Sequence, residues 1–325
     1  MTLLRLSKTL TRAAFGAGFA FPVWALDLAL PVDCALGETC YIQQYFDHDP
    51  STAWGDFTCG SLAYDGHDGT DFAVPTRAAM ESGVAVLAAA PGTVAGIRDG
   101  VEDFAPKVAG KECGNGVVVD HGGGWQTQYC HMRMGSVRVA VGDAVDTGTP
   151  LGLIGQSGMA EFPHMHLAVR KDGVEVDPFA PTATNSCDLA SADTARDDLW
   201  LPDMPYQPGG VIGAGFSTEV PEFDAIKSGL GSPITLPANS PALVLWVYMF
   251  GAQAGDAVLF EIVGPEGSII TERTALEKTQ ALLFRAVGRK MRGDGWPAGV
   301  YRGTARLMRG AKELSAVAVT LTIAP

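Results

Sequence analysis

Four of the six histidines of this chain lie in three short segments, each of which has further groups able to take part in metal chemistry. The segments are Gly66–Asp71, Tyr129–Met132 and Pro163–His166. Successive side chains of a β-strand point to opposite faces, so His164 and His166 point the same way and lie roughly 6–7 Å apart along the strand. One imidazole can then bind a metal ion while the other stands beside a water on that ion.

His67 and Asp71 are four residues apart, which on an ideal strand separates them by about 13 Å, too far to share one ion. The backbone must therefore bend between them, and Gly66 and Gly69 can supply the bend. The same spacing on a helix would bring the side chains together, but two glycines within six residues disfavour a helix. Two histidines and one carboxylate leave one open position on a tetrahedral zinc, which is typical of catalytic sites.

Short apolar runs broken by glycine supply the elements that would position these groups, and they predict β-strands. They are Val84–Ala88, Gly92–Ile97 and Gly116–Asp120. Residues 117–120 and 125–132 flank the tract His121-Gly-Gly-Gly, so we expect a hairpin whose glycines take the positive φ angles of its turn.

These motifs resemble the lysostaphin-type metallopeptidases, also called the LytM or LAS domain. The resemblance runs from about Gly66 to Phe179 and keeps the family's order: H-x-x-x-D, a glycine-bounded hairpin ending in Y-x-H, the run from Val141 to Gly152, Gly155-Gln-Ser-Gly, and H-x-H. It implies a small, open, largely antiparallel β-structure with the site in a groove. It also implies that the zinc ligands are His67, Asp71 and His166, and that the two catalytic histidines outside the ligand set are His131 and His164.

Zinc would polarise the scissile carbonyl and lower the pKa of its bound water to about 7. One of His131 and His164 would take the water's proton, and the other would donate a hydrogen bond; the sequence does not say which does which. Tyr129 lies two residues from His131, so we expect it on the same face as a candidate oxyanion or substrate contact, with an ordinary packed tyrosine as the alternative. Relatives often carry an acid where this chain has Ala168, and threonine and glycine where it has Glu161 and Phe162.

Changes in composition predict a mainly β protein with five parts. Residues 1–25 form a signal peptide, because Arg5, Lys8 and Arg12 precede a thirteen-residue apolar stretch that is too short to span a membrane. After it we expect a disulfide-rich lead-in at 26–60, the metallopeptidase domain at 61–181, a linker at 182–210 and an immunoglobulin-like β-sandwich at 211–325. Residues 276–289 suggest a helix or an irregular connection. No membrane span is expected once the signal is removed.

The six cysteines all follow the signal peptide, so we expect disulfides. Six cysteines allow about 15 pairings, which sequence alone cannot resolve. Cys130 should face away from Tyr129 and His131, so a bridge to Cys113 could brace the hairpin from behind. The lead-in could cover the site as an autoinhibitory segment.

Residues 26–204 hold 26 acids and 9 bases, whereas residues 205–325 hold 10 acids and 11 bases. So acidic a first half argues against nucleic acid as a partner. A lipoyl-type carrier is also excluded, because the turn at His121 lacks the lysine that carriers need.

We therefore expect an exported, periplasmic enzyme with one zinc ion per chain. It would hydrolyse peptide cross-links of peptidoglycan, with D-alanyl-meso-diaminopimelate as the expected bond, and the sandwich could bind a regulatory protein. The alternatives are a non-catalytic wall-binding or hydrolase-activating protein, and a zinc protease of protein substrates.

Overall fold

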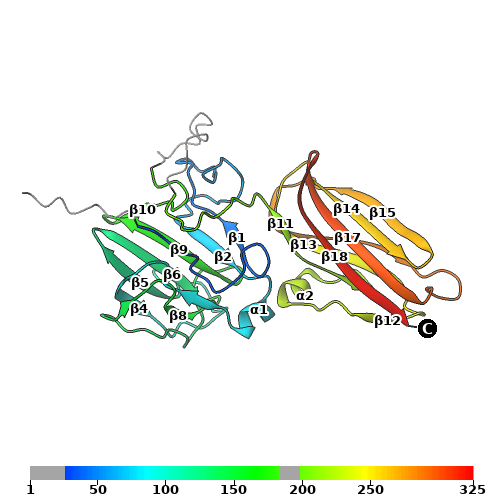
Figure 1. Cartoon of the computed structure of the whole chain (residues 1–325), viewed down its shortest axis with the longest axis horizontal. Coiled ribbons are helices and arrows are strands. Elements are labelled where there is room, and N and C mark those ends of the chain that lie inside the picture. The colour runs from blue at the N-terminus through cyan, green and yellow to red at the C-terminus, as the bar shows by residue number, and fades with distance from the viewer. Residues whose placement is uncertain (1–25, 183–197, 325) are drawn as a thin grey trace, which may run out of the picture.

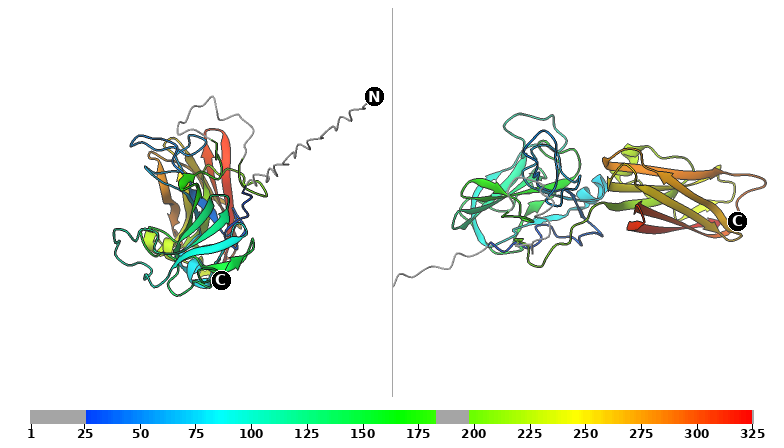
Figure 2. Two further views of the ribbon diagram at one scale, coloured as in Figure 1. Left: turned by 90° about the vertical axis from the view of Figure 1, so that its left-hand side faces the viewer. Right: turned by 90° about the horizontal axis from the view of Figure 1, so that it is seen from above.

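The computed structural model describes residues 26–182 and 198–324, and it consists mainly of β-strands (Figures 1 and 2). The predicted signal peptide and Cys187 lie outside these residues. The N-terminal half contains β1 (Tyr41–Gln44), β2 (Thr70–Ala73), α1 (Arg77–Ser82), β3 (Ala85–Leu87), β4 (Gly92–Arg98), β5 (Asn115–Gly122), β6 (Trp125–Met132), β7 (Ala144–Val145), β8 (Pro150–Leu153), β9 (His164–Lys171) and β10 (Val174–Val176). The C-terminal half contains β11 (Gly210–Ser217), α2 (Phe223–Ser228), β12 (Thr235–Pro237), β13 (Ala242–Ala252), β14 (Ala257–Gly264), β15 (Gly267–Ala275), β16 (Gln280–Lys290), β17 (Gly299–Arg309) and β18 (Lys312–Ala324).

One antiparallel sheet, in the order β1-β2-β9-β6-β5-β4-β7 with β10 beside β9, forms the framework of the N-terminal half. The predicted hairpin is present as β5 and β6. One face of β9 packs into the core through Met165, Leu167 and Val169, all of which are fully buried. The other face carries His164 and His166, as the two-residue period of the strand predicts.

The segment predicted as a lead-in belongs to this sheet. β1 pairs antiparallel with β2, and Leu28 and Tyr45 are completely buried in the same core. Residues 198–210 of the predicted linker are described by the structure. Trp200 in this stretch forms a β-bridge with Leu28 and packs into the same core. The lead-in therefore supplies an edge strand of the sheet, and its autoinhibitory role stays a prediction.

Two sheets, β11-β13-β16 and β12-β18-β17-β14-β15, share one hydrophobic core in the C-terminal half. Phe216 and Leu245 enter it from the first sheet, and Phe260 and Tyr301 enter it from the second. The expectation of a helix or an irregular connection at 276–289 is wrong, because most of this stretch forms β16. The immunoglobulin-like arrangement stays a prediction.

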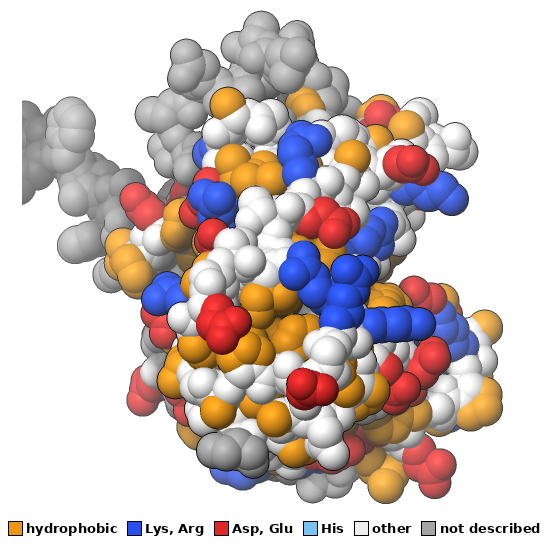
Figure 3. All heavy atoms as spheres, turned by 90° about the vertical axis from the view of Figure 1, so that its right-hand side faces the viewer, with side chains coloured by type: hydrophobic (Ala, Val, Ile, Leu, Met, Phe, Trp, Pro, Cys, Tyr) orange, Lys and Arg blue, Asp and Glu red, His pale blue; other side chains and the backbone are white. Residues whose placement is uncertain are grey.

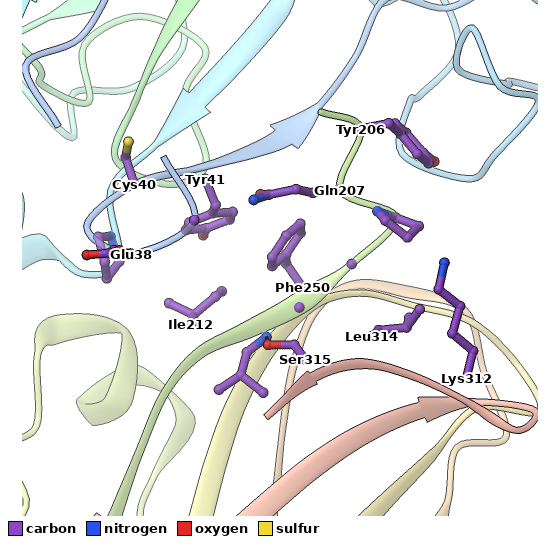
Figure 4. Close-up of a pocket in the computed structure, with 16 residues that line it drawn as sticks. Glu38, Cys40, Tyr41, Tyr206, Gln207, Ile212, Phe250, Lys312, Leu314 and Ser315 are labelled. Atoms are coloured by element: carbon purple, nitrogen blue, oxygen red, sulfur yellow. Dashed lines mark hydrogen bonds between the residues drawn. The ribbon is translucent and has the colours of Figure 1, made fainter. Parts of the chain in front are cut away.

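The two halves pack against each other at two places. The Tyr41 ring lies 4.6 Å from the Phe250 ring, beside a cavity of about 280 Å³ whose lining comes from both halves (Figure 4). Helices α1 and α2 meet where the Arg77 guanidinium lies 2.9 Å from the Asp224 carboxylate (Figure 1). Gly229, which ends α2 with a φ of 107°, allows this approach, since a Cβ there would lie 2.7 Å from Ala78.

Basic side chains gather on the surface of the C-terminal half, beside exposed hydrophobic ones (Figure 3). This agrees with the slight excess of bases over acids in residues 205–325. Within the described ranges, no helix has both the length and the apolar character needed to cross a membrane.

Candidate metal centre

Strand pairing brings the predicted ligands together. Asp71 on β2 lies opposite His166 on β9, and residues directly opposite in an antiparallel pair point to the same face. His67 reaches them from the loop before β2, where Gly66 has a φ of 76°. A Cβ on Gly69 would lie 2.7 Å from the His166 ring, so only glycine lets this loop pass so close. The two glycines thus provide the predicted bend, one through its φ angle and the other through its lack of a side chain.

Three atoms of these residues form a nearly equilateral triangle. The Nε2 atom of His67 lies 3.1 Å from Asp71 Oδ1 and 3.1 Å from His166 Nδ1, and the last two are 3.0 Å apart. All three residues are buried. Ligands of a tetrahedral zinc with bonds of about 2.0–2.1 Å lie about 3.3 Å from one another. The donor set and its spacing therefore fit a zinc ion with one face of the triangle open.

Neighbouring acceptors fix the tautomers of both histidines of the triangle. His67 Nδ1 donates to the carbonyl oxygen of Tyr45 at 2.6 Å, and because a carbonyl only accepts, Nε2 keeps its lone pair. His166 Nε2 lies 3.2 Å from Asp68 Oδ1, which leaves Nδ1 facing the other two residues. Such outer partners orient metal-binding imidazoles and raise their basicity. This contact gives Asp68, the residue after His67, a role at the site.

The carboxylates also set the protonation of this cluster. Burial lowers the pKa of His166, but hydrogen bonds to Asp68 and Asp71 outweigh it and raise the value to about 9. Burial acts to raise the pKa of Asp71, but the surrounding histidines hold it well below its usual range. The cluster without metal therefore pairs an ionised carboxylate with an imidazolium, and that proton must leave before the lone pair can bind a cation.

His131 and His164 stand beside the triangle with their ring centroids 4.6 Å apart. Each Nδ1 donates to a backbone carbonyl at 2.8 Å, from His131 to Ser157 and from His164 to Phe162. Each ring therefore keeps an unprotonated Nε2. Burial and the neighbouring histidines lower the pKa of His131 to about 3, and burial lowers that of His164 as well. Both rings are neutral at neutral pH and can accept a proton from a water between them.

Tyr129 does not join this group, which corrects the expectation that it shares a face with His131. It lies opposite Leu167, whose side chain points into the core, and its own side chain is fully buried. Its hydroxyl oxygen accepts a hydrogen bond from the Ala89 amide at 2.8 Å and another from the Thr127 hydroxyl at 3.0 Å. It is the packed tyrosine of the alternative interpretation.

A β-bulge explains the error. Asn115 of β5 pairs with Met132 and Val117 pairs with Tyr129, so β6 holds one residue more than β5 over this interval. The extra residue breaks the alternation, and His131 takes a φ of 61°, which is uncommon for a residue with a side chain. The bulge turns His131 onto the face that carries His166.

The predicted bridge between Cys113 and Cys130 is present, but on the opposite side from the one expected. Cys130 lies directly opposite His166, so it points to the same face. Both cysteines line the groove with His131. A second bridge joins Cys34 to Cys40, and Cys59 forms no disulfide within the described residues.

The site lies in a groove of about 1170 Å³. The N-terminal sheet contributes Asp71, Gln128, His164, His166 and Arg170 to its lining, and the loops contribute Tyr64, Lys107, Glu161 and Phe162. The C-terminal half adds Phe223, Lys227, Gln280, Ala281 and Leu282. The structure thus brings the four predicted histidines and the predicted aspartate together. All of them except His67 line the groove, and the C-terminal half adds a wall that the sequence motifs did not indicate.

Three partners of the site were not identified from the sequence. The Tyr45 carbonyl carries no side-chain signal, so only the fold shows it. Phe162, whose ring stacks on His164 at a centroid distance of 4.3 Å, was noted only as a departure from the family pattern. Asp68 had a signal, because it lies beside His67 in a loop that must fold back towards the other ligands.

Comparisons with known proteins agree with this geometry. The model of peptidase family M23 matches residues 65–178. Over 129 residues, or 40% of its length, the chain is 33% identical to the DD-carboxypeptidase/endopeptidase Mpg of Neisseria gonorrhoeae. Over 100 residues, or 31% of its length, it is 33% identical to the peptidoglycan DD-endopeptidase ShyA of Vibrio cholerae. These matches span only 25% and 19% of the two relatives.

Two solved structures show lower similarity. The chain is 23% identical to a zinc-containing peptidase from Vibrio cholerae, with a TM-score of 0.29 and coverage of 41% of this chain and 39% of that one. It is 21% identical to the catalytic domain of lysostaphin from Staphylococcus simulans, with a TM-score of 0.28 and coverage of 42% and 85%. The family match includes all three residues of the triangle and both adjacent histidines, and residues 65–178 are a domain of peptidase family M23, the lysostaphin family.

Proposed function

We propose that this protein is a zinc-dependent endopeptidase that hydrolyses the peptide cross-links of bacterial peptidoglycan. The observation that carries the proposal is the triangle of His67 Nε2, Asp71 Oδ1 and His166 Nδ1, with two neutral histidines beside it in one groove. Membership of the peptidase family and similarity to two DD-endopeptidases support it. A domain kept only for binding would not need the complete set.

When bound, zinc would act as a Lewis acid on the scissile carbonyl and increase the acidity of a water. His131 and His164 would then perform the proton transfers, because each holds an unprotonated Nε2 in the groove. One would accept the proton of the attacking water at its Nε2. The same proton would then pass to the departing amine, either from this ring or after transfer to the second ring, so no other proton source is needed. The carbonyls of Ser157 and Phe162 keep the two rings in the required tautomer.

The expected substrate bond is D-alanyl-meso-diaminopimelate, and the expected compartment is the periplasm. The relatives named as DD-endopeptidases support the bond. The two disulfides support an oxidising compartment, and the predicted signal peptide at 1–25 provides the route of export. A regulatory protein bound through the C-terminal half remains part of the proposal.

The test combines zinc analysis with digestion of purified, cross-linked peptidoglycan. We expect the wild type to hold one zinc ion per chain and to release monomeric muropeptides. His164→Ala should keep the zinc and lose hydrolysis. His121→Ala is the matched control, because this histidine is not part of the groove lining. It bonds to the Pro91 carbonyl and the Thr127 hydroxyl, and its loss should leave activity intact. A wild type that holds zinc but releases no monomers would contradict the proposal and favour a wall-binding or activating role.

A further inference from the structure

One wall of the groove comes from outside the family match. Residues 65–178 match the peptidase family, whereas Phe223 and Lys227 of α2 and Gln280–Leu282 of β16 belong to the C-terminal half. These residues line the same groove as His131, His164 and His166. A substrate bound along the groove would therefore contact both halves of the chain.

This wall is held firmly in place. The Phe223 ring stacks on Phe284 at a centroid distance of 5.3 Å and meets the edge of Tyr248 at 5.6 Å. From the other half, Gln43 Nε2 donates to the Ala281 carbonyl at 2.9 Å, and Arg77 forms its salt bridge with Asp224. Because both sides of the groove are connected directly, the wall is preorganised for a ligand.

The charge of the groove differs from that of the chain. The lining holds four bases (Arg98, Lys107, Arg170 and Lys227) and four acids (Asp68, Asp71, Glu112 and Glu161), whereas the whole chain holds 23 bases and 36 acids. Asp71 belongs to the metal site and Asp68 to His166. The lining of the groove is therefore less acidic than the chain as a whole, which favours the binding of an anionic group there.

Lys227 is the basic residue on the C-terminal wall whose ammonium group can still pair with a negatively charged ligand. Arg170 lies 3.0 Å from Glu175, and Lys107 lies 3.1 Å from Glu161, so each has its own carboxylate. Lys227 lies 3.4 Å from Asp224, but that carboxylate is already engaged by Arg77 at 2.9 Å. The Lys227 side chain is 38% exposed and its ammonium lies 5.2 Å from the Phe223 ring centre, so a ligand on this wall can reach it.

We propose that α2 and the start of β16 form a substrate subsite in which Lys227 binds a free carboxylate of the peptide. Phe223 and Leu282, both half-buried, would contact the aliphatic part of the same peptide. The inference rests on the proposed function, because cross-linked stem peptides carry free carboxylates on diaminopimelate and at their C-termini. It makes the C-terminal half part of substrate recognition and not only a separate module.

The experiment compares Lys227→Gln with Lys312→Gln, an exposed lysine of the same half that lies outside the groove. With soluble cross-linked muropeptide dimers, we expect Lys227→Gln to raise KM about fivefold, as for a partly exposed ion pair. Its kcat should stay within twofold of the wild type, and Lys227→Arg should recover most of the affinity. Lys312→Gln should match the wild type.

A dimer with amidated carboxylates identifies the group that is bound. The wild type should lose about fivefold in KM with it, and Lys227→Gln should lose nothing further. Equal losses in both proteins, or an unchanged KM in Lys227→Gln, would overturn the inference while hydrolysis by the wild type upholds the proposed function. Calorimetric binding of the dimer to His164→Ala, with and without Lys227→Gln, tests the subsite without turnover, and equal binding there would also overturn it.

Discussion

The disulfide between Cys113 and Cys130 should matter for both stability and hydrolysis, and the effects can be separated. Its cysteines are 17 residues apart, so removing it by Cys113→Ser with Cys130→Ser should cost about 3 kcal/mol of unfolding free energy by loop entropy. The backbone amide of His131 also donates to the Cys113 carbonyl at 2.8 Å. Loss of the bridge should therefore displace His131, and a shift of about 1 Å can lower a rate as much as 100-fold.

The matched control is Cys34→Ser with Cys40→Ser, whose bridge closes a separation of 6 residues and should cost about 2 kcal/mol. Both variants are assayed at a temperature where near-ultraviolet circular dichroism shows them folded. We expect a fall of about 10- to 100-fold in kcat for the first pair and less than twofold for the control, with zinc content unchanged in both. Full activity without the Cys113 bridge, or an equal loss in the control, would refute the reasoning.

Three further predictions concern the residues around the site. Tyr129→Phe should keep at least half of the activity but lower the unfolding free energy by about 1–3 kcal/mol, because the Ala89 amide loses its acceptor; a 100-fold loss of kcat would return Tyr129 to the catalytic groups. Below a pKa of about 9, His166 must release a proton to bind zinc, so the zinc affinity measured by chelator competition should fall about tenfold per pH unit between pH 8 and pH 6; a pH-independent affinity would contradict this. Deleting residues 26–46 should lower hydrolysis and the melting temperature, since His67 loses the Tyr45 carbonyl; a rise in hydrolysis would support autoinhibition.

The part of the site that follows from regular strand geometry could be predicted from the sequence. His164 and His166 share a face because a strand has a period of two. The hairpin at His121 and the bend at Gly66 and Gly69 also follow from residue types, because each needs glycine at a fixed place. These local rules account for the positions of His67, Asp71, His164 and His166, whereas the choice of ligands rested on the resemblance to the lysostaphin-type family.

His131 reaches the site by a departure from the same rule. The motif Y-x-H implies a shared face for Tyr129 and His131, and the bulge reverses it. Nothing in the local sequence marks the bulge, since the residue with positive φ is a histidine and not a glycine. Cys130 keeps the regular alternation with Tyr129, so the bulge brings His131 onto the face that already carries the disulfide, and the expected separation of the two is lost.

Strand β16 was missed for a different reason. Alternation of apolar and polar residues indicates a strand with one face exposed to solvent. Both faces of β16 are instead covered by other parts of the protein. Leu283 and Val287 face the core between the two sheets, while Leu282 and Phe284 pack beside α2. Apolar residues on both faces remove the two-residue period, and the stretch then reads as a helix or an irregular connection.

The part of the chain needed to build the site and its groove is therefore larger than the segment from Gly66 to Phe179 that carries the motifs. A domain that began at residue 61 would lack the Tyr45 carbonyl, which orients His67. A domain that ended at residue 181 would lack Trp200 and Met204, which are part of its hydrophobic core. A boundary at residue 210 would remove the wall that Phe223 and Lys227 build along the groove. Each of these contacts joins positions far apart in the sequence, so a scan for local motifs cannot find them. The motifs specify which atoms meet at the metal, whereas docking between the halves decides what shape and charge the substrate meets.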